Sequence, residues 1–198
     1  MKVSRPYRMR ARADAAAETG RRIVDAMFGL LRDERLDAIS VRAIAARAGV
    51  TVQTVLRRFG SKEGAFVAAV EQARAQILAQ RGTTPAGNPM AAVTNLFDHY
   101  ERWGRTVLRL LEQEERAPQI RAIVLEGRRT HAEWVARVFA PELSGLRGGA
   151  RARRHTQLVA VTDVYVWKLL CHDLGVPRAD AEEMVLGMTR ALCAWRGA

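Results

Sequence analysis

The side chains best suited to chemistry lie between residues 40 and 62, in the segment SVRAIAARAGVTVQTVLRRFGSK. Hydroxyl, amide and guanidinium groups recur there between short apolar runs. Hydroxyl groups at helix N-termini bind phosphate oxygens, whereas Gln and Arg side chains can pair with base edges. The chemistry that this segment favours is therefore hydrogen bonding to a nucleic acid.

Two short helices are expected to position these groups. Ser40 can cap a first helix, and Gly49 supplies a tight bend. Thr51 can cap a second helix that runs from Val52 to Arg58 and has a polar and basic outer face. The first helix places its apolar residues on one side: Val41, Ile44, Ala45 and Ala48. Two helices that meet at a glycine turn are typical of a helix-turn-helix motif, here at residues 41–60, and indicate a protein that reads DNA.

The N-terminal residues of the second helix are the candidates for base contact. Gln53 can pair with adenine, Val52 can rest on a thymine methyl group, and Arg57 can reach guanine or a phosphate. A solvated surface role is the alternative for each of these residues. The predicted DNA-binding residues are Ser40, Thr51, Val52, Gln53, Thr54, Arg57, Arg58 and Lys62.

Positive charge is concentrated in the same part of the chain. The 198 residues have a formal net charge of +11. Residues 1–62 carry 14 Lys and Arg against 6 Asp and Glu, which is +8, and the remaining 136 carry 18 against 15, which is +3. A surface that faces phosphates has this asymmetry. An Arg-rich and Ala-rich composition also follows from codon bias, but codon bias does not explain why the charge is uneven.

A basic arm, residues 1–17, precedes the first expected helix. Flexible basic arms can insert Arg side chains into a minor groove, and they can equally be disordered, solubilising tails. The basic residues of this arm are Lys2, Arg5, Arg8, Arg10 and Arg12.

The rest of the chain has helical periodicity, so we expect an all-α fold of about nine helices. A first helix is expected from about Glu18 to Asp33, and the run GTTPAGNP at 82–89 separates the first helices from a second unit. A further loop is expected at 141–151. The last two helices are expected at about Ala152–Asp173 and Ala179–Trp195.

Neither a secretion signal nor a run as long as a membrane span is found in the sequence. Cys171 and Cys193 match no metal-ligand or redox spacing, and we expect both to be small buried side chains in a cytoplasmic protein. The sequence contains no nucleophile elbow, P-loop or paired metal ligands, so an enzyme is not expected.

The segment resembles the DNA-binding signature of the tetracycline-repressor (TetR) family of transcriptional regulators over roughly residues 18–80. The resemblance is carried by Ser40–Ala45, by Ala48-Gly49-Val50 at the turn, by Thr51 through Phe59, and by Ser61-Lys62-Glu63. Two positions depart from the family pattern. Leu56 replaces a Tyr that commonly contacts a phosphate, and Gln53 replaces a small residue. We expect Leu56 to lie in the core of the DNA-binding unit.

The resemblance implies a helix-turn-helix domain at residues 18–64 and a ligand-binding and dimerisation domain at residues 65–198. It also implies that the last two helices form a four-helix bundle in a homodimer, which would bind a near-palindromic operator. Apolar residues surround the helix at 158–170 and form a seam in the final helix, as a partner subunit would require, although a larger monomeric core is the alternative. The expected interface residues are Val159, Val166, Trp167, Leu170, Met184, Met188, Ala191 and Trp195.

A pocket for a small-molecule inducer or co-repressor is expected in the middle helices, again from the resemblance. No cofactor or metal is expected. Bulky aromatic residues with a few polar groups suit an apolar pocket, but at helical spacing they also form ordinary cores. The candidates are Phe97, His99, Tyr100, Trp103, Leu110, Trp134 and Tyr165.

Three functions remain open from the sequence. The expected one is a repressor, released from double-stranded DNA by its ligand, with no role at a membrane. A non-specific, nucleoid-type DNA binder would also be strongly basic, but it would not need so large and apolar a second unit. The third is a TetR-like protein that activates transcription or binds only a partner, with Leu56 marking weakened DNA contacts.

Overall fold

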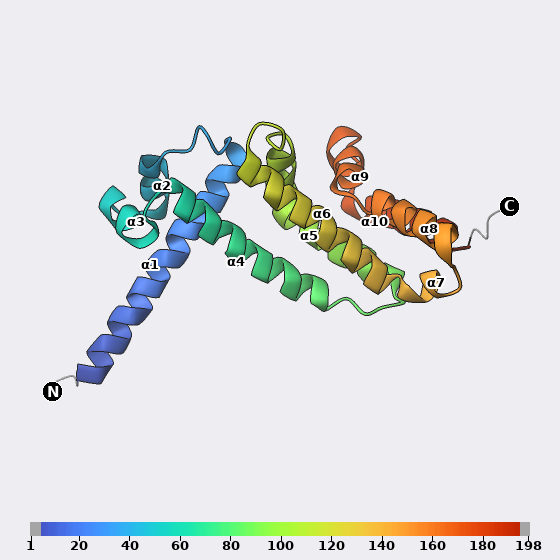
Figure 1. Ribbon diagram of the computed structural model, residues 1–198, viewed down its shortest axis with the longest axis horizontal. Helices are drawn as coiled ribbons and strands as arrows, with labels where there is room; N and C mark the ends of the chain where they lie inside the picture. The colour runs from blue at the N-terminus through green and yellow to red at the C-terminus, as the bar shows by residue number, and fades with distance from the viewer. Residues whose placement is uncertain (1–4, 195–198) are drawn as a thin grey trace. The chain divides into compact units, whose positions relative to one another are not determined.

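The structure is a computed structural model that describes residues 5–194, without the side chains of residues 5–8 and 11. Within residues 5–194 every regular element is helical and there is no strand, which confirms the expected all-α fold. The chain divides into two compact units, Met1–Gln76 and Ile77–Ala198 (Figure 1). The division falls later than the boundary that the sequence predicted after residue 64.

The first unit contains α1 (Arg5–Asp33), α2 (Val41–Ala48), α3 (Val52–Phe59) and most of α4 (Lys62–Gly82). Each helix contributes apolar side chains to one small core, because its apolar residues recur at helical spacing. The fully buried members include Ile23, Met27, Leu31, Ile39, Ile44, Val55 and Ala65. This core holds α2 and α3 against α1.

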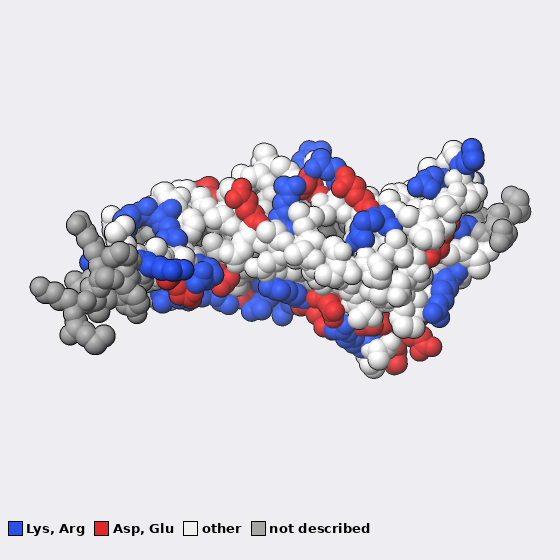
Figure 2. All heavy atoms as spheres, turned by 90° about the horizontal axis from the view of Figure 1, so that it is seen from below, with Lys and Arg blue, Asp and Glu red and all other residues white. Residues whose placement is uncertain are grey.

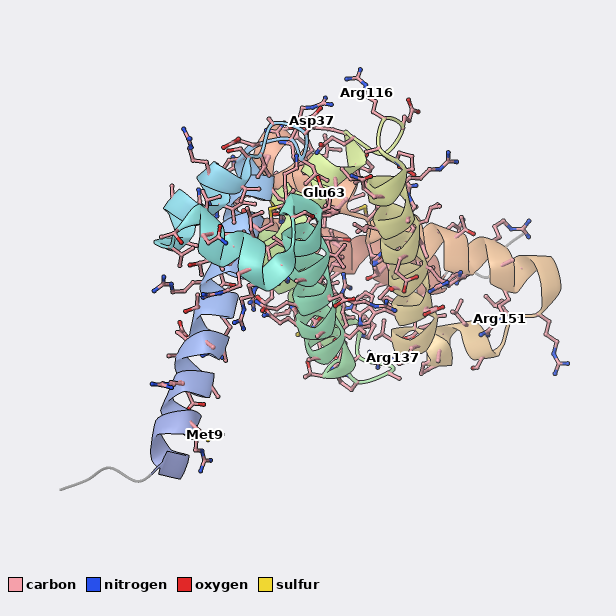
Figure 3. The ribbon with its side chains drawn as sticks, turned by 60° about the vertical axis from the view of Figure 1, so that its left-hand side comes forward. Met9, Asp37, Glu63, Arg116, Arg137 and Arg151 are labelled. Atoms are coloured by element: carbon pink, nitrogen blue, oxygen red, sulfur yellow. The ribbon has the colours of Figure 1, made fainter. Side chains whose placement is uncertain are left out.

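Helix α1 begins at Arg5, well before the expected start near Glu18, so the predicted flexible arm is wrong for residues 5–17. Ala and Arg are strong helix formers, and the segment ARADAAAE has no residue that breaks a helix. The extension is exposed at each residue from Asp14 to Glu18, and the side chain of Met9 projects from it (Figure 3). A helix without a buried stripe has no apolar periodicity, which is why the sequence pattern did not reveal it. Lys2 lies outside the described residues.

The second unit contains the end of α4 and the remaining helices. These are α5 (Pro89–Leu111), α6 (Pro118–Val138), α7 (Ala140–Ser144), α8 (Gly148–Val161), α9 (Val164–Lys168), the π-helical turn η1 (Leu169–Asp173) and α10 (Arg178–Ala194). The loop expected at 141–151 is wrong in part, because α7 and the start of α8 occupy it. Phe97, Phe139, Leu143 and Leu158 are among the fully buried side chains of this core.

The expected single helix Ala152–Asp173 is also wrong, because it is broken at Thr162–Asp163. The Asp163 carboxylate accepts a hydrogen bond of 3.0 Å from the amide of Tyr165 and so caps α9. The Thr162 hydroxyl donates to the Leu158 carbonyl at 2.7 Å. Side chains of Thr and Asp compete with helical hydrogen bonds in this way, and they turn the chain between two apolar runs.

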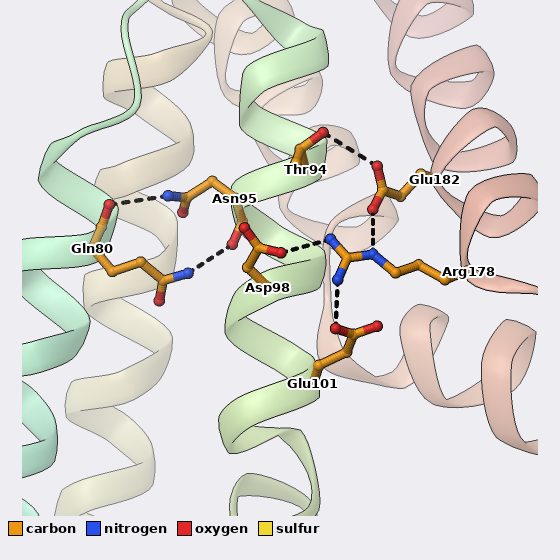
Figure 4. Close-up of polar contacts among 7 residues, drawn as sticks. All are labelled: Gln80, Thr94, Asn95, Asp98, Glu101, Arg178 and Glu182. Atoms are coloured by element: carbon orange, nitrogen blue, oxygen red, sulfur yellow. Dashed lines mark hydrogen bonds and ion pairs between the residues drawn. The ribbon is translucent and has the colours of Figure 1, made fainter.

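Polar contacts fix α10 and the end of α4 to α5 (Figure 4). Arg178 binds three carboxylates, those of Asp98 at 2.6 Å, Glu182 at 2.7 Å and Glu101. These partners raise the pKa of the Arg178 guanidinium. On the other side of α5, the Gln80 amide donates to the Asn95 carbonyl and the Asn95 amide donates to the Gln80 carbonyl, at 3.1 and 3.0 Å.

No helix among the described residues combines the length and the apolar character that crossing a membrane requires.

Candidate nucleic-acid interface

The two helices of the motif begin with side-chain caps, as the sequence predicted. The Ser40 hydroxyl accepts a hydrogen bond of 3.1 Å from the amide of Ala43, and the Thr51 hydroxyl accepts one of 3.2 Å from the amide of Thr54. The hydroxyls of Thr51 and Thr54 lie 2.9 Å apart. A hydroxyl that accepts from an amide keeps its own proton, so the Ser40 hydroxyl is still able to donate to a phosphate oxygen.

The turn between α2 and α3 is made by Gly49, whose φ of 63° and ψ of 41° lie in the left-handed region. The Gly49 amide bonds back to the carbonyls of Ala45 and Ala46, which ends α2. Arg22 of α1 donates from Nη2 to the Gly49 carbonyl at 3.0 Å. The bend that sets the angle of the recognition helix is thus fixed both by its own backbone and by α1.

Helix α3 presents one face to solvent along most of its length. Gln53, Arg57 and Arg58 are exposed, and Val55 is the residue of this helix that is buried in the core. Val52 and Leu56, four residues apart and so on one face of the helix, are each 38% exposed. The expectation that Leu56 lies in the core is therefore wrong. The buried position of α3 is taken by Val55, and Leu56 follows it on the exposed side of the helix. The exposed face combines amide, guanidinium and apolar groups.

Two of the predicted DNA-binding residues have contacts within the unit. Lys62 donates from Nζ to the Leu36 carbonyl at 3.0 Å, so its ammonium holds the loop before α2. The guanidinium of Arg58 lies against α1 at Gly20, where a Cβ atom would meet Arg58 Nε at 2.5 Å. Contact with DNA stays a prediction for both residues, as it does for Ser40, Thr51, Val52, Gln53, Thr54 and Arg57.

Sequence reasoning missed the residues that support the motif from α1. Arg47 of α2 packs its guanidinium on Gly29, and its Nη1 lies 3.9 Å from the Asp33 carboxylate. Glycines in an Ala-rich helix mark positions where another group comes close, so Gly20 and Gly29 were the available signal. Glu63 lies at the start of α4 (Figure 3). Hydrogen bonds to its carboxylate from the Glu63 backbone amide and from the Ser61 hydroxyl lower the pKa of that carboxyl group.

Charge alone does not mark an interface on the face of the molecule shown in Figure 2. On the face shown in Figure 2, basic side chains lie among acidic and uncharged ones, without separating into large regions of one sign. The geometry of α2 and α3, with capped N-termini and exposed polar groups, is therefore the stronger indication of a nucleic-acid site.

The residues predicted to line a pocket belong to two environments. Phe97, His99, Tyr100, Leu110 and Trp134 are buried in the second unit, whereas Trp103 is half-buried beneath the Arg102 guanidinium at 4.7 Å. Tyr165 is 56% exposed, so its assignment to the interior is wrong. The cause is the break at Thr162–Asp163, which restarts the helix in a new phase.

Three of these buried residues, His99, Tyr100 and Trp134, lie near a charged side chain that the sequence did not single out, Arg81. The Arg81 guanidinium lies 4.2 Å from the ring centroid of Trp134 and 6.0 Å from that of Tyr100. Burial, with the nearby charge of Arg81, lowers the pKa of His99 to about 2. Burial likewise lowers the pKa of His131 to about 3, so both imidazoles are neutral at pH 7. Burial also raises the pKa of the Tyr100 hydroxyl.

The predicted interface residues also divide into two sets. Trp167 is buried in the core of its own chain, where its ring packs on Gly104 and lies 4.6 Å from the His172 ring, so its assignment to a subunit interface is wrong. Val159, Val166 and Leu170 are half-buried against the same core. The exposed members are Met184, Met188 and Ala191, and Trp195 lies outside the described residues.

No group of His, Cys, Asp and Glu side chains within the described part of the chain is arranged to hold a metal ion. Cys171 and Cys193 are half-buried, not fully buried as expected. Burial raises the pKa of both thiols.

The fold and the site define a helix-turn-helix DNA-binding protein. The model of the family described as bacterial regulatory proteins, tetR family, matches residues 23–69. This match covers α2 and α3 with the end of α1 and the start of α4. Residues 23–69 are thus a DNA-binding domain of the kind found in TetR-family regulators.

Solved structures show that the likeness in fold extends beyond the matched domain. A transcriptional regulator of Rhodococcus sp. Rha1 is 20% identical, with a TM-score of 0.68, over 87% of this chain and 95% of that one. A TetR-family transcriptional regulator of Rhodococcus sp. is 16% identical, with a TM-score of 0.66, over 89% of this chain and the whole of that one. Comparison with curated protein sequences gives no match.

Proposed function

We propose that this protein is a transcriptional regulator of the TetR family. It acts as a cytoplasmic, homodimeric repressor that binds a near-palindromic operator and is released when a small molecule binds its second unit. The observation that carries the proposal is the exposed face of α3, which presents Val52, Gln53 and Arg57 next to a capped N-terminus. A major groove admits one helix, and residues in the first turns of that helix reach the base edges.

The exposed apolar residues of the last helices support the dimer. Tyr165, Leu169, Met184 and Met188 are large apolar side chains open to solvent on α9, η1 and α10. Large exposed apolar patches are uncommon on soluble monomers and mark interaction surfaces. In a two-fold dimer the same residues of each subunit meet, and the two recognition helices then bind half-sites about 34–36 Å apart.

Release by a ligand requires that the ligand bind one conformation better than the other. A ligand that prefers the form whose recognition helices are wrongly spaced for DNA lowers the protein's affinity for DNA. The size of this effect is set by how much more tightly the ligand binds that form than the DNA-binding form. The buried polar residues around Arg81 support a ligand site in the second unit, because burying polar groups costs stability unless another role retains them.

Selection of bound sequences from a random duplex library tests the function, at about 150 mM salt so that non-specific binding is weak. We expect a near-palindromic consensus. Enrichment without a consensus would show that charge dominates the binding. A reporter gene under the selected operator then separates repression from activation, which is the alternative. The exposed Leu56 cannot donate a hydrogen bond to a phosphate, so it bears on the strength of DNA binding and not on this choice.

The dimer is tested by light scattering at micromolar concentration. We expect the unmodified protein to have twice the monomer mass, and Met184→Glu with Met188→Glu to have the monomer mass. Leu125→Glu is the matched control, because Leu125 is equally exposed but lies on α6. A monomeric unmodified protein, or a dimer that the Met substitutions leave intact, would contradict the proposed interface.

A further inference from the structure

Arg81 is a buried cation whose surroundings contain no carboxylate partner in the described structure. Its side chain is 5% exposed, and Nη1 has no hydrogen-bond partner. Its neighbours are instead the ring of Trp134, the ring of Tyr100 and the Tyr100 hydroxyl. Arginine remains charged inside proteins, and an unpaired buried charge is costly. Folding alone does not explain why an arginine occupies this position.

The polar atoms around this cation are unsatisfied in the same way. Nε1 of Trp134, Nδ1 of His99 and Nδ1 of His131 are buried without hydrogen-bond partners. Buried polar groups are nearly always paired, so several unpaired ones in a single cluster indicate a missing partner. We call this group the Arg81 cluster: Arg81, His99, Tyr100, His131 and Trp134.

The hydrogen bonds within the cluster show which of its unpaired polar atoms are donors. The Thr162 hydroxyl donates to the Leu158 carbonyl, so it accepts from Nε2 of His131 at 3.1 Å. The Tyr100 hydroxyl donates to the Thr162 carbonyl at 2.8 Å. Nδ1 of the neutral His131 is therefore an acceptor, and the indole N–H and guanidinium Nη1–H groups are donors without partners. The charge of the cluster is positive. A ligand that pairs with these donors and with the charge must be an acceptor that carries negative charge.

The backbone around Arg81 is fixed from two sides. Arg137, labelled in Figure 3, donates to the carbonyls of Arg81 and Thr84 at 2.6 and 2.7 Å. The neighbouring Gln80 exchanges two hydrogen bonds with Asn95 of α5 (Figure 4). A charged group held in this way is already in position for its partner, which reduces the entropy lost on binding.

We propose that the Arg81 cluster binds a small organic acid with an apolar body, whose carboxylate pairs with the guanidinium of Arg81. The planar guanidinium fork matches a carboxylate, and the Trp134 N–H adds a further donor. The aromatic rings of Tyr100 and Trp134 provide the apolar surface beside the charge. This proposal adds a class of ligand to the proposed function. Binding of the acid is independent of that function, whereas the release of DNA by the acid rests on it.

Calorimetric titration of the full-length protein without DNA tests the site. The probes are benzoate and hexanoate, with benzamide as the uncharged analogue of benzoate and acetate and inorganic phosphate as anions without an apolar body. We expect one of the two acids to bind more tightly than benzamide, acetate or phosphate by about tenfold to a hundredfold, as a charged hydrogen bond contributes. Binding of neither acid, or equal binding of benzamide, would overturn the proposal. Equal binding of phosphate or acetate would show a site for simple anions and would also overturn it.

The variant Arg81→Met removes the charge and keeps the length of the side chain. We expect binding of the acid to fall by about tenfold or more, while the melting temperature stays the same or rises, because an unpaired buried charge is lost. Arg121→Met, at an exposed position of α6, is the control and should leave binding unchanged. Unchanged binding in Arg81→Met would overturn the site. A lower melting temperature with unchanged binding would show that Arg81 only supports the fold.

The same titration on the DNA complex separates the two proposals. An acid that binds the protein but does not change its affinity for the selected operator leaves the site in place and contradicts ligand release. A protein that binds its operator but no acid contradicts the site and leaves DNA binding in place.

Discussion

Arg22 of α1 and Gly49 of the turn are joined by a hydrogen bond of 3.0 Å, from the guanidinium to the main-chain oxygen. The bond reaches the residue whose left-handed backbone sets the direction of the recognition helix. Substitution of Gly49 therefore tests the geometry of the whole motif.

We expect Gly49→Ala to lower the free energy of unfolding by about 1–2 kcal/mol, the cost of a left-handed conformation for a residue with a Cβ atom. Urea unfolding measures this loss. Gly127→Ala is the control, because Gly127 lies within α6 and a Cβ atom there would contact nothing within 4 Å. This control should be neutral or more stable by about 0.5–1 kcal/mol. Equal effects of the two substitutions would contradict the role of the turn.

Gln53→Ala is expected to change sequence preference without changing the fold. A bidentate contact with a base provides about 1–3 kcal/mol of discrimination, so one operator position should become tolerant of all four bases. Binding of operator variants by fluorescence anisotropy measures it, with circular dichroism as the check on folding. A uniform loss of affinity across all the sequences would assign Gln53 to the phosphates.

Gly104→Ala is expected to destabilise the second unit. A Cβ atom at Gly104 would lie 2.5 Å from the ring of Trp167, which is buried and cannot move away easily. Overpacking of this kind costs about 1–3 kcal/mol, and urea unfolding should show it. Gly187→Ala on α10 provides the comparison, because a Cβ atom there would contact nothing within 4 Å. Equal stability of the two variants would mean that Trp167 repacks freely.

Stability should fall in mild acid because His99 and His131 are buried as neutral groups. Their pKa values are lowered to about 2 and about 3, whereas an unfolded histidine titrates near pH 6.5. Between these pKa values, the two histidines take up protons only in the unfolded chain. The contribution of these histidines to the free energy of unfolding is therefore fully present above about pH 6.5. As the pH falls below about 6.5, the free energy of unfolding decreases by about 1.4 kcal/mol per pH unit for each histidine.

Urea unfolding at several pH values between 7.5 and 5 measures this slope. His131→Gln should reduce it by the contribution of one histidine, even where the variant is less stable at every pH. His172→Gln, at an exposed position, is the control. The same slope in the His131 variant and the unmodified protein would show that the imidazole gains protons in the folded state.

The caps and the turn of the motif could be predicted from sequence because they depend on neighbouring residues. Ser40, Gly49 and Thr51 act on amides within four positions of themselves, so residue type and spacing were sufficient. The exposed start of α1 and the break at Thr162–Asp163 could not be predicted in this way. The first has no buried stripe, and the second interrupts an apolar run that continues on both sides.

Arg81 shows the limit of sequence reasoning at the site. At the end of a helix an arginine is the expected basic residue and is normally exposed. Its burial arises from α5 and α6, which follow it in the chain, and no local pattern encodes their packing. The burial of Trp134 and Tyr100 was available from periodicity, but the cation beside them was not.

The helical extension at the start of α1 bears on how a DNA-binding protein of this kind would search a chromosome. Arg10 and Arg12 are exposed there, in the part of the chain that carries most of the positive charge. A protein held loosely by phosphates slides along the duplex instead of returning to solution after each failed encounter, so it finds its target sooner. The same attraction keeps it longer on sequences without an operator. We therefore expect the charge of this extension to set the balance between a faster search and a larger fraction of molecules held elsewhere on the genome.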